Sequence, residues 1–419
     1  MLFVAAGCSA SSQPTTSTLN PPTDGGSDAS TRDSGANDAT FDASMPDTGS
    51  TDGGIDSSTP DTGSTDGGID SSTPDTGSTD GGIDSSTPDA GSTDGGIDSS
   101  TPDAGSTDAG STDDAGTNGH VLYTLTNNHW FRIEAVDGGV PEDLTTKLDV
   151  LSPQPPGTTG QIDSCISESY DGQWLVSATA RFNCASGACL AVMNRGITTG
   201  EKLMTGGAEL TASSSRPAIT SNGAVVIFSN TGPHSLDLYA TSRTTGGWTT
   251  PLLLTGSSPH LFHHDPYISS DASKIVFDCG DTSPYQEPGT SICEVHTDGT
   301  GFRIVTTPTS YPGGTMQNET HTPSYSPDGS VVFEADWESE QVWRLPVGAT
   351  VPVLVSPPAF TDDNSPCVFP DGRIASYWLG RPGNPAGLHE LKVMNADGSN
   401  YFMLVELQDI VDIGMSCGK

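Results

Sequence analysis

The chain has 419 residues, of which 50 are glycine and 31 are proline, and so many turn-forming residues exclude a mainly helical protein. The formal net charge is −38, from 53 acidic and 15 basic residues, so binding to nucleic acid or to an anionic lipid surface is not expected. The sequence contains no run of about 18 apolar residues, and therefore no candidate for a membrane-spanning helix.

The chain opens with a short apolar segment that ends in Gly7-Cys8-Ser9. Small residues directly before a cysteine resemble the lipobox of bacterial lipoproteins. The resemblance implies that residues 1–8 are the end of a lipoprotein signal, that Cys8 carries the lipid anchor, and that Ser9 permits export to the outer membrane. No Lys/Arg-rich region precedes the short apolar run, so we expect the true start to lie upstream of Met1. The alternative is a chance cysteine near a start codon.

Residues 9–118 carry 21 aspartates against one arginine, Arg32, and a 14-residue repeat, TGSTDGGIDSSTPD, begins at Thr48, Thr62 and Thr76. This segment has almost no large apolar residues, so burial cannot offset its conformational entropy. We expect a long, disordered, self-repelling acidic tether. The regular aspartates also suggest calcium binding, but the ligand order of an EF-hand loop is absent.

From Gly119 onward, aromatic and β-branched residues occur in short alternating runs between Gly, Pro and Asp turns, as in β-strands. The segment THTPSYSPDGSVVFE, residues 320–334, predicts two strands joined by a tight turn. The hairpin occurs five times, at intervals of 43 to 57 residues. Its turn positions are Gly172, Gly223, Ala272, Gly329 and Gly372.

A third short strand follows each hairpin, and a fourth follows most of them, which is typical of the blades of a β-propeller. One such sheet cannot bury both of its faces, whereas sheets arranged radially pack on their neighbours. The segment His120–Thr145 lacks a leading strand, and the β-rich segment Leu407–Ser416 has no partner. We therefore predict an all-β protein: a six-bladed β-propeller of four-stranded antiparallel blades over residues 119–419, closed by that C-terminal segment as the innermost strand of the first blade.

The repeated element P-x-[YF]-S-P-D-G-x-x-[VI]-x-F resembles the TolB-type propeller repeats of the broad WD-like class, most closely at Ser324–Gly329. The resemblance covers the chain from Gly119 to its end. It implies the fold strongly and a function weakly, because propellers support many unrelated activities. A TolB-like role beside a peptidoglycan-associated lipoprotein is an analogy only, since a predicted tether stands where TolB has a folded N-terminal domain.

The cysteines indicate disulfides and hence an oxidising, exported compartment. Cys184 and Cys189 bracket a hairpin tip, and Cys279 and Cys293 occupy the corresponding places in another blade, so both pairs are expected to be bonded. Cys417 ends the closing strand and would lock the ring if it bonded either Cys165 or Cys367. Zinc ligation is the alternative, but no C-x2-C pair exists.

The richest polar cluster is the segment 260–265, HLFHHD. When the blades are aligned on their turns, His264 and His321 occupy equivalent positions at the entrance of two innermost strands, and Asn364 fills that position in another blade. We expect a binding site at the channel mouth, with His264 and His321 as candidate ligands of a divalent metal. The site residues are His263, His264, Asp265, His321 and Asn364.

The first functional hypothesis is an envelope- or surface-anchored outer-membrane lipoprotein whose propeller is a non-catalytic module that binds an envelope protein or a glycan. The second is a metal-dependent polysaccharide lyase, since residues 316–329, MQNETHTPSYSPDG, resemble a metal-binding region of oligogalacturonate lyases. The third is a purely structural envelope protein. No catalytic motif, such as G-x-S-x-G, supports an enzyme. We expect a monomer without nucleic-acid partners and without an obligatory cofactor, attached to the membrane only through Cys8.

Overall fold

The computed structural model describes residues 118–419, with gaps at 126, 128, 157–162, 164, 214–215, 283–287, 359, 361, 379–387, 409 and 411–414. The proposed lipidation residue Cys8 and the predicted tether, apart from its last residue Asn118, lie outside the described residues.

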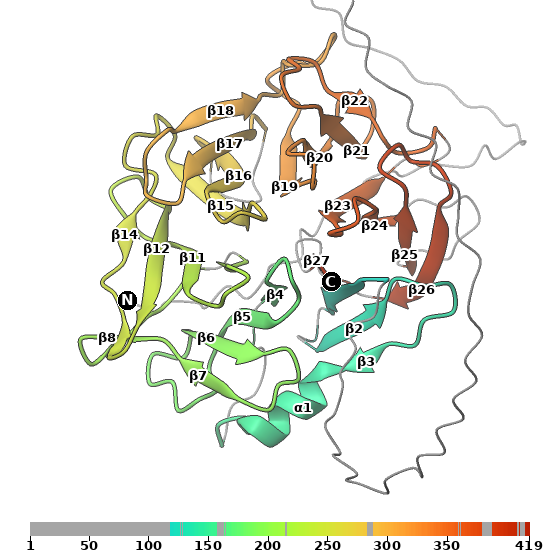
Figure 1. Ribbon diagram of the computed structural model, residues 1–419. Helices are drawn as coiled ribbons and strands as arrows, with labels where there is room; N and C mark the ends of the chain where they lie inside the picture. Colours follow the sequence, from blue (N-terminus) through green and yellow to red (C-terminus); the bar gives the residue numbers. More distant parts are fainter. Residues whose placement is uncertain are drawn as a thin grey trace, which may run out of the picture. The chain divides into compact units, whose positions relative to one another are not determined.

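Six β-sheets surround a common axis and form a six-bladed β-propeller, as the hairpin repeat predicted (Figure 1). All pairings between neighbouring strands within the six blades are antiparallel. The strand nearest the axis is β27, β4, β10, β15, β19 or β23, and the following strands lie progressively further out.

The strands of each blade are given from the axis outward. Blade 1 contains β27 (Ser416–Gly418), β1 (His120–Thr124), β2 (Trp130–Glu134) and β3 (Glu142–Asp143). Blade 2 contains β4 (Ser167–Glu168), β5 (Trp174–Thr179), β6 (Cys189–Asn194) and β7 (Gly200–Lys202). Blade 3 contains β10 (Ala218–Ile219), β11 (Val225–Asn230), β12 (Asp237–Thr244) and two short strands that both pair with β12, namely β13 (Gly247–Trp248) and β14 (Leu252–Leu253).

Blade 4 contains β15 (Phe262–Ile268), β16 (Lys274–Gly280), β17 (Ser291–His296) and β18 (Arg303–Thr306). Blade 5 contains β19 (Thr320–Tyr325), β20 (Val331–Ala335), β21 (Gln341–Leu345) and β22 (Val353–Leu354). Blade 6 contains β23 (Asp363–Val368), β24 (Ile374–Trp378), β25 (Leu388–Met394) and β26 (Phe402–Gln408). A separate hairpin, β8 (Met204–Thr205) and β9 (Ala208–Glu209), connects blades 2 and 3.

Six hydrophobic clusters hold the ring together, one at each interface between adjacent blades. Neighbouring residues of one strand serve opposite interfaces because side chains alternate across a sheet. In β16, Phe277 packs in the cluster shared with blade 3, and Val276 packs in the cluster shared with blade 5. This two-sided burial explains why the second strand of a blade is an almost continuous apolar run.

The conformation of the repeated turn depends on its glycine position and on the residue before it. The five turn positions have positive φ angles, from 59° at Ala272 to 90° at Gly372. In the best-conserved copy of the element, Gly329 N–H donates to Ser326 O (2.9 Å), and Asp328 Oδ1 accepts from Ser330 N–H (3.0 Å). The S-P-D-G letters therefore encode a left-handed turn that an aspartate side chain stabilises.

A C-terminal strand closes the ring, as expected, but it is not the predicted segment. Leu407 belongs to the outermost strand β26, whose partner is β25, and only the last predicted residue, Ser416, lies in the closing strand β27. β27 pairs with β1, with Val121 opposite Cys417. Three apolar residues of the predicted segment, Leu407, Ile410 and Met415, instead pack in the cluster between blades 6 and 1.

One short helix, α1 (Leu144–Leu151), follows β3 and was not predicted. Asp143 caps it by accepting from Thr146 N–H (3.2 Å), and Leu144 and Leu148 pack in the cluster between blades 1 and 2. Within the described ranges, no helix is both long enough and apolar enough to cross a bilayer.

Candidate functional site

The innermost strands of blades 4, 5 and 6 share an irregularity at the positions where the sequence predicted a site. Asp265, Thr322 and Ser365 each have a positive φ of 47° to 49°, and each precedes a proline. The strand register shifts at these places, between His264 and Tyr267 in blade 4 for example. Proline has no N–H for the ladder, and the resulting bulge re-aims the neighbouring side chains.

Each of two bulges is held by a carboxylate from the preceding blade. Asp278, opposite His264 in the strand register, accepts a hydrogen bond from Thr322 N–H (3.2 Å). Glu334, opposite His321, accepts from Ser365 N–H (2.8 Å). These bonds join blade 4 to blade 5 and blade 5 to blade 6 next to the axis.

The structure brings His264, Asp265 and His321 together around Asp278, and we call these four residues the histidine–aspartate cluster. His264 Nδ1 lies 2.7 Å from Asp265 Oδ2 and 3.7 Å from Asp278 Oδ2. His321 Nδ1 lies 3.6 Å from the same oxygen of Asp278. The sequence placed both imidazoles at the mouth of the central channel; the structure brings both to Asp278, an additional member, and leaves only His321 partly exposed.

Burial is the largest influence on the pKa of both aspartates of the cluster. It raises the pKa of the Asp278 carboxyl, although His321 and His264 favour the ionised form. At Asp265, the hydrogen bond and charge of His264, together with Arg216, outweigh burial and lower the pKa. Arg216 N–H also donates to Asp265 Oδ1 (3.2 Å). The cluster therefore retains negative charge on Asp265 at neutral pH.

Only one edge of the cluster is accessible. The side chains of His264, Asp265 and Asp278 are 3%, 1% and 1% exposed, whereas that of His321 is 18% exposed. His321 Nε2 contacts Glu319, a residue outside the cluster, at 3.1 Å. Burial raises the pKa of Glu319, but the stronger combined effect of His321 lowers it. Glu319 thus stands as a carboxylate at the entrance.

The other two predicted site residues do not join this cluster. His263 contacts Leu236 O through Nδ1 (2.8 Å) and Ser258 Oγ through Nε2 (2.7 Å). Its ring is fully buried, and burial lowers its pKa to about 4. Asn364 is also buried, in β23, opposite Tyr377. The sequence grouped His263 with His264, but successive side chains of a strand point to opposite faces.

Asp278 and Glu334 were missed by the sequence prediction, although a signal for them exists. Both follow a valine and a phenylalanine at the end of a second strand, in Val276-Phe277-Asp278 and Val332-Phe333-Glu334. An acidic residue at the same position of two apolar strands is unusual, because a buried carboxylate needs partners.

Two cavities lie elsewhere in the described part of the propeller. The first is on the axis among residues of four blades, including Glu168, Arg216, Tyr267 and Ser416, and its volume of about 20 Å³ suits a single water molecule. The second, of about 550 Å³, lies beside blade 1 and is lined in part by Arg132, Lys147 and Arg195. Glu142 pairs with both Arg132 and Lys147, so this cavity has little free positive charge.

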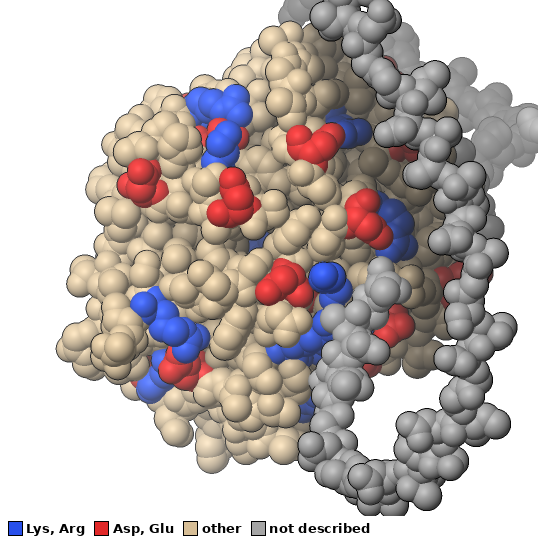
Figure 2. All heavy atoms as spheres, viewed as in Figure 1, with Lys and Arg blue, Asp and Glu red and all other residues tan. Residues whose placement is uncertain are grey.

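Charged side chains on one face of the propeller are mixed in sign. On the face seen in Figure 2, acidic and basic side chains lie next to one another in small groups rather than in one large field. Such a surface offers no extended electrostatic attraction for a polyanion, in line with the low count of basic residues.

Three disulfides are present among the described cysteines. Two are the expected pairs, Cys184–Cys189 and Cys279–Cys293. The third, Cys367–Cys417, joins β23 of blade 6 to β27 of blade 1, which settles the alternative for Cys417 that the sequence left open.

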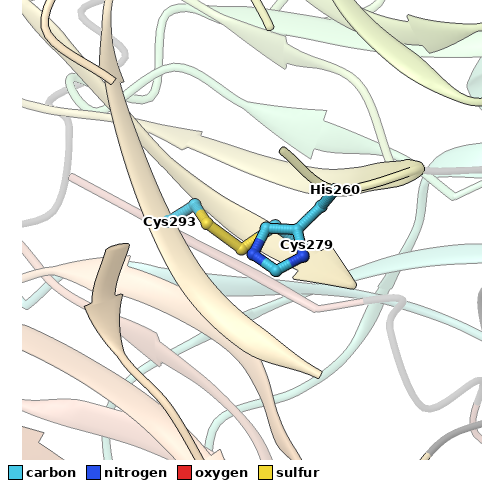
Figure 3. Close-up of side chains that lie close together, drawn as sticks. All are labelled: His260, Cys279 and Cys293. Atoms are coloured by element: carbon cyan, nitrogen blue, oxygen red, sulfur yellow. A yellow bond between two sulfur atoms is a disulfide. The ribbon is translucent and has the colours of Figure 1, made fainter. Parts of the chain in front are cut away.

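His260 lies beside the Cys279–Cys293 disulfide (Figure 3). Its Nδ1 is 3.3 Å from Asp281 Oδ1. Because the two sulfur atoms are bonded to each other, they are not thiolate ligands, so this group does not constitute a zinc site in the oxidised protein.

The comparisons with known proteins agree with the fold. No family model and no curated protein matches the chain. TolB from Acinetobacter baumannii matches in structure with a TM-score of 0.51 at 12% identity, over 72% of this chain and 67% of that chain. A putative TolB from Agrobacterium tumefaciens matches with a TM-score of 0.47 at 16% identity, over 72% of this chain and 96% of that chain.

A puromycin-hydrolyzing peptidase from Mycobacterium tuberculosis matches less well, with a TM-score of 0.44 at 12% identity, over 68% of this chain and 42% of that chain. At such identities structural similarity shows the fold alone. The described residues form a six-bladed β-propeller, and their similarity to TolB is a similarity of fold, as the repeated S-P-D-G element indicated.

Proposed function

We propose that the protein is an exported cell-envelope lipoprotein, anchored to the outer membrane through Cys8, whose TolB-type propeller is a non-catalytic module that binds an envelope protein or a glycan. The disulfides support export, because such bonds persist in oxidising compartments and are rare in the cytosol. The acidic sequence between Cys8 and the propeller suits a spacer between a membrane and a binding domain.

The observation that carries the binding role is the contrast between a closed cluster and an open surface beside it. Three members of the histidine–aspartate cluster are almost fully buried. A hydrolytic or lyase centre must bring substrate to its acid, base or metal, and a catalytic metal keeps an open coordination position. The cluster offers such access only at His321.

The surface next to this cluster is suited to a partner. We define the mouth surface as Leu261, Met316, Glu319 and His321, which lie in β19 or in the segments that lead into β15 and β19 of two adjacent blades. Leu261 and Met316 are 44% and 59% exposed. Exposed apolar side chains beside polar ones are typical of binding surfaces.

Anchoring can be tested by metabolic labelling with a fatty acid in a Gram-negative host that expresses the chain with a complete lipoprotein signal ahead of Cys8. We expect label in the wild type and none in Cys8→Ser, which should also leave the membrane fraction. The variant Ser9→Ala is the matched control, because it changes the neighbouring residue and keeps the thiol. Unlabelled wild-type protein would refute the anchor and leave the propeller fold unaffected.

The non-catalytic role can be tested with the full-length protein and oligogalacturonate, in the presence of Mn²⁺ or Zn²⁺. The formation of unsaturated sugar products can be followed by ultraviolet absorbance. We expect no turnover above that of a heat-unfolded sample. Turnover that His321→Ala abolishes would replace the binding role with a lyase.

A further inference from the structure

We propose that His264, Asp265, Asp278 and His321 bind one divalent transition-metal ion of the Zn²⁺ class, which braces blade 4 against blade 5. This inference goes beyond the binding role proposed above and does not depend on it. Two imidazoles and two carboxylates are a ligand set that Zn²⁺ accepts in tetrahedral sites, and Mn²⁺ also binds such groups.

The spacing of the donor atoms suits a single ion. In a tetrahedral site with bonds of about 2.0–2.1 Å, neighbouring ligand atoms are about 3.3 Å apart. The distances from His264 Nδ1 to the oxygens of Asp265 and Asp278 are 2.7 and 3.7 Å, and His321 Nδ1 is 3.6 Å from Asp278 Oδ2. One oxygen or nitrogen of each of His264, Asp265 and Asp278 lies within 4.8 Å of the others. His321 Nδ1 is close to Asp278 but stands outside this group of three, so binding of an ion would draw its ring toward His264 and Asp265.

A second, independent observation points to a ligand at this place. Asp278 is 1% exposed, and among the described residues no group donates a hydrogen bond to its Oδ1. Buried carboxylate oxygens nearly always have a partner, because leaving one without a partner costs about 1–3 kcal/mol or more. A cation at the cluster would satisfy this oxygen.

The orientation of His321 gives the same indication. In the neutral tautomer that donates Nε2–H to Glu319 (3.1 Å), Nδ1 carries a lone pair toward Asp278 Oδ2. With that tautomer, a cation between the two atoms would remove the repulsion between their lone pairs. A carboxylate that holds the outer nitrogen of a histidine is also the usual support for a metal-binding imidazole.

The backbone fixes the two carboxylates as a metal site requires. Arg216 N–H donates to Asp265 Oδ1, and Thr322 N–H donates to Asp278 Oδ2. Such hydrogen bonds orient ligands before the ion binds. Because the ligand His321 belongs to blade 5, as does Thr322, and the three other ligands belong to blade 4, an ion here would join the two blades.

The next blade interface supplies an internal control. Glu334 occupies the position in β20 that Asp278 occupies in β16, and it holds the bulge at Ser365 in the same way. There, however, Asn364 stands in the place of the second histidine. The interface between blades 5 and 6 therefore lacks the second imidazole ligand. Glu334→Gln should leave metal binding between blades 4 and 5 unchanged.

The test uses the full-length protein, stripped with a chelator and titrated with Zn²⁺ and separately with Mn²⁺. Bound metal is measured by mass spectrometry after dialysis, in the wild type, Asp278→Asn, His321→Ala and Glu334→Gln. We expect about one ion per chain in the wild type and Glu334→Gln, and more than about 100-fold weaker binding in Asp278→Asn and His321→Ala, because losing a ligand costs more than losing its support.

Absorption of the Co²⁺-loaded wild type in the visible range gives a second readout, which depends on no variant. We expect the bands of a four-coordinate site with nitrogen donors, and their loss when Zn²⁺ is added. Less than one-tenth of an ion per chain in the wild type would overturn the proposal. So would unchanged binding in a His321→Ala variant that circular dichroism shows to be folded, or an equal loss in Glu334→Gln.

Discussion

The disulfide between the first and last blades should be the strongest covalent brace of the propeller. Replacing both cysteines of a pair by alanine removes the constraint that the bond places on the unfolded chain. The pairs close loops of 50 residues for Cys367–Cys417, 14 for Cys279–Cys293 and 5 for Cys184–Cys189. In the chain-entropy model these loops correspond to about 4, 3 and 2 kcal/mol of unfolding free energy.

Guanidinium unfolding of the full-length wild type and the three double variants measures these differences, with coincident fluorescence and circular dichroism transitions as the test of two-state behaviour. Cys279–Cys293 is the matched control, because both pairs are buried and they differ in whether they cross from one blade to another. We expect the Cys367→Ala/Cys417→Ala variant to lose the most stability. A loss no larger than that of Cys184→Ala/Cys189→Ala would refute the view that this bond locks the ring.

Three further predictions concern single residues. Because burial lowers the pKa of His263 to about 4, the unfolded chain binds this proton more readily, and stability falls as the pH drops from about 6.5 to 4. His263→Gln should remove about 2 kcal/mol of the stability difference between about pH 7 and pH 5, and an unchanged difference would contradict this reading. Arg181→Met should lower the free energy of unfolding by about 3–5 kcal/mol, since the Arg181 side chain is fully buried in an ion pair. The same substitution at Arg344, whose ion pair is more exposed, should cost less than about 1 kcal/mol, and equal costs would contradict this prediction. Gly372→Ala should lower the free energy of unfolding by about 1–2 kcal/mol through the φ of 90° alone, because no atom lies within contact of the new methyl group. Gly246 is equally uncrowded and has no positive φ, so Gly246→Ala should not destabilise the protein, and thermal unfolding of both variants measures the difference.

The blade architecture could be predicted from the sequence because the turn residues have one physical role. The positive φ that Gly329 requires recurs at every turn position, and the strands between turns alternate or run apolar as their burial demands. The closing strand was placed too early, at Leu407, because strand propensity does not distinguish the outermost strand of one blade from the innermost strand of another.

The candidate site was predictable only in part. Aligning the turns placed His264 and His321 at equivalent positions, and the structure brings both to Asp278. Asp278 itself comes from a different strand, opposite His264, and Asp265 reaches the cluster at a register shift that the sequence pattern does not reveal. His263 shows the converse, since adjacency in sequence places two side chains on opposite faces of a strand.

The most direct test of the account measures the binding of the labelled full-length protein to isolated cell envelopes. Met316→Asp places a charge on the mouth surface, and Val353→Asp, at a position of similar exposure on the outer strand β22, is its control. We predict saturable binding that Met316→Asp weakens at least about tenfold and Val353→Asp leaves unchanged. The absence of saturable binding, or an equal effect of the two variants, would contradict a propeller that binds its partner through the mouth surface.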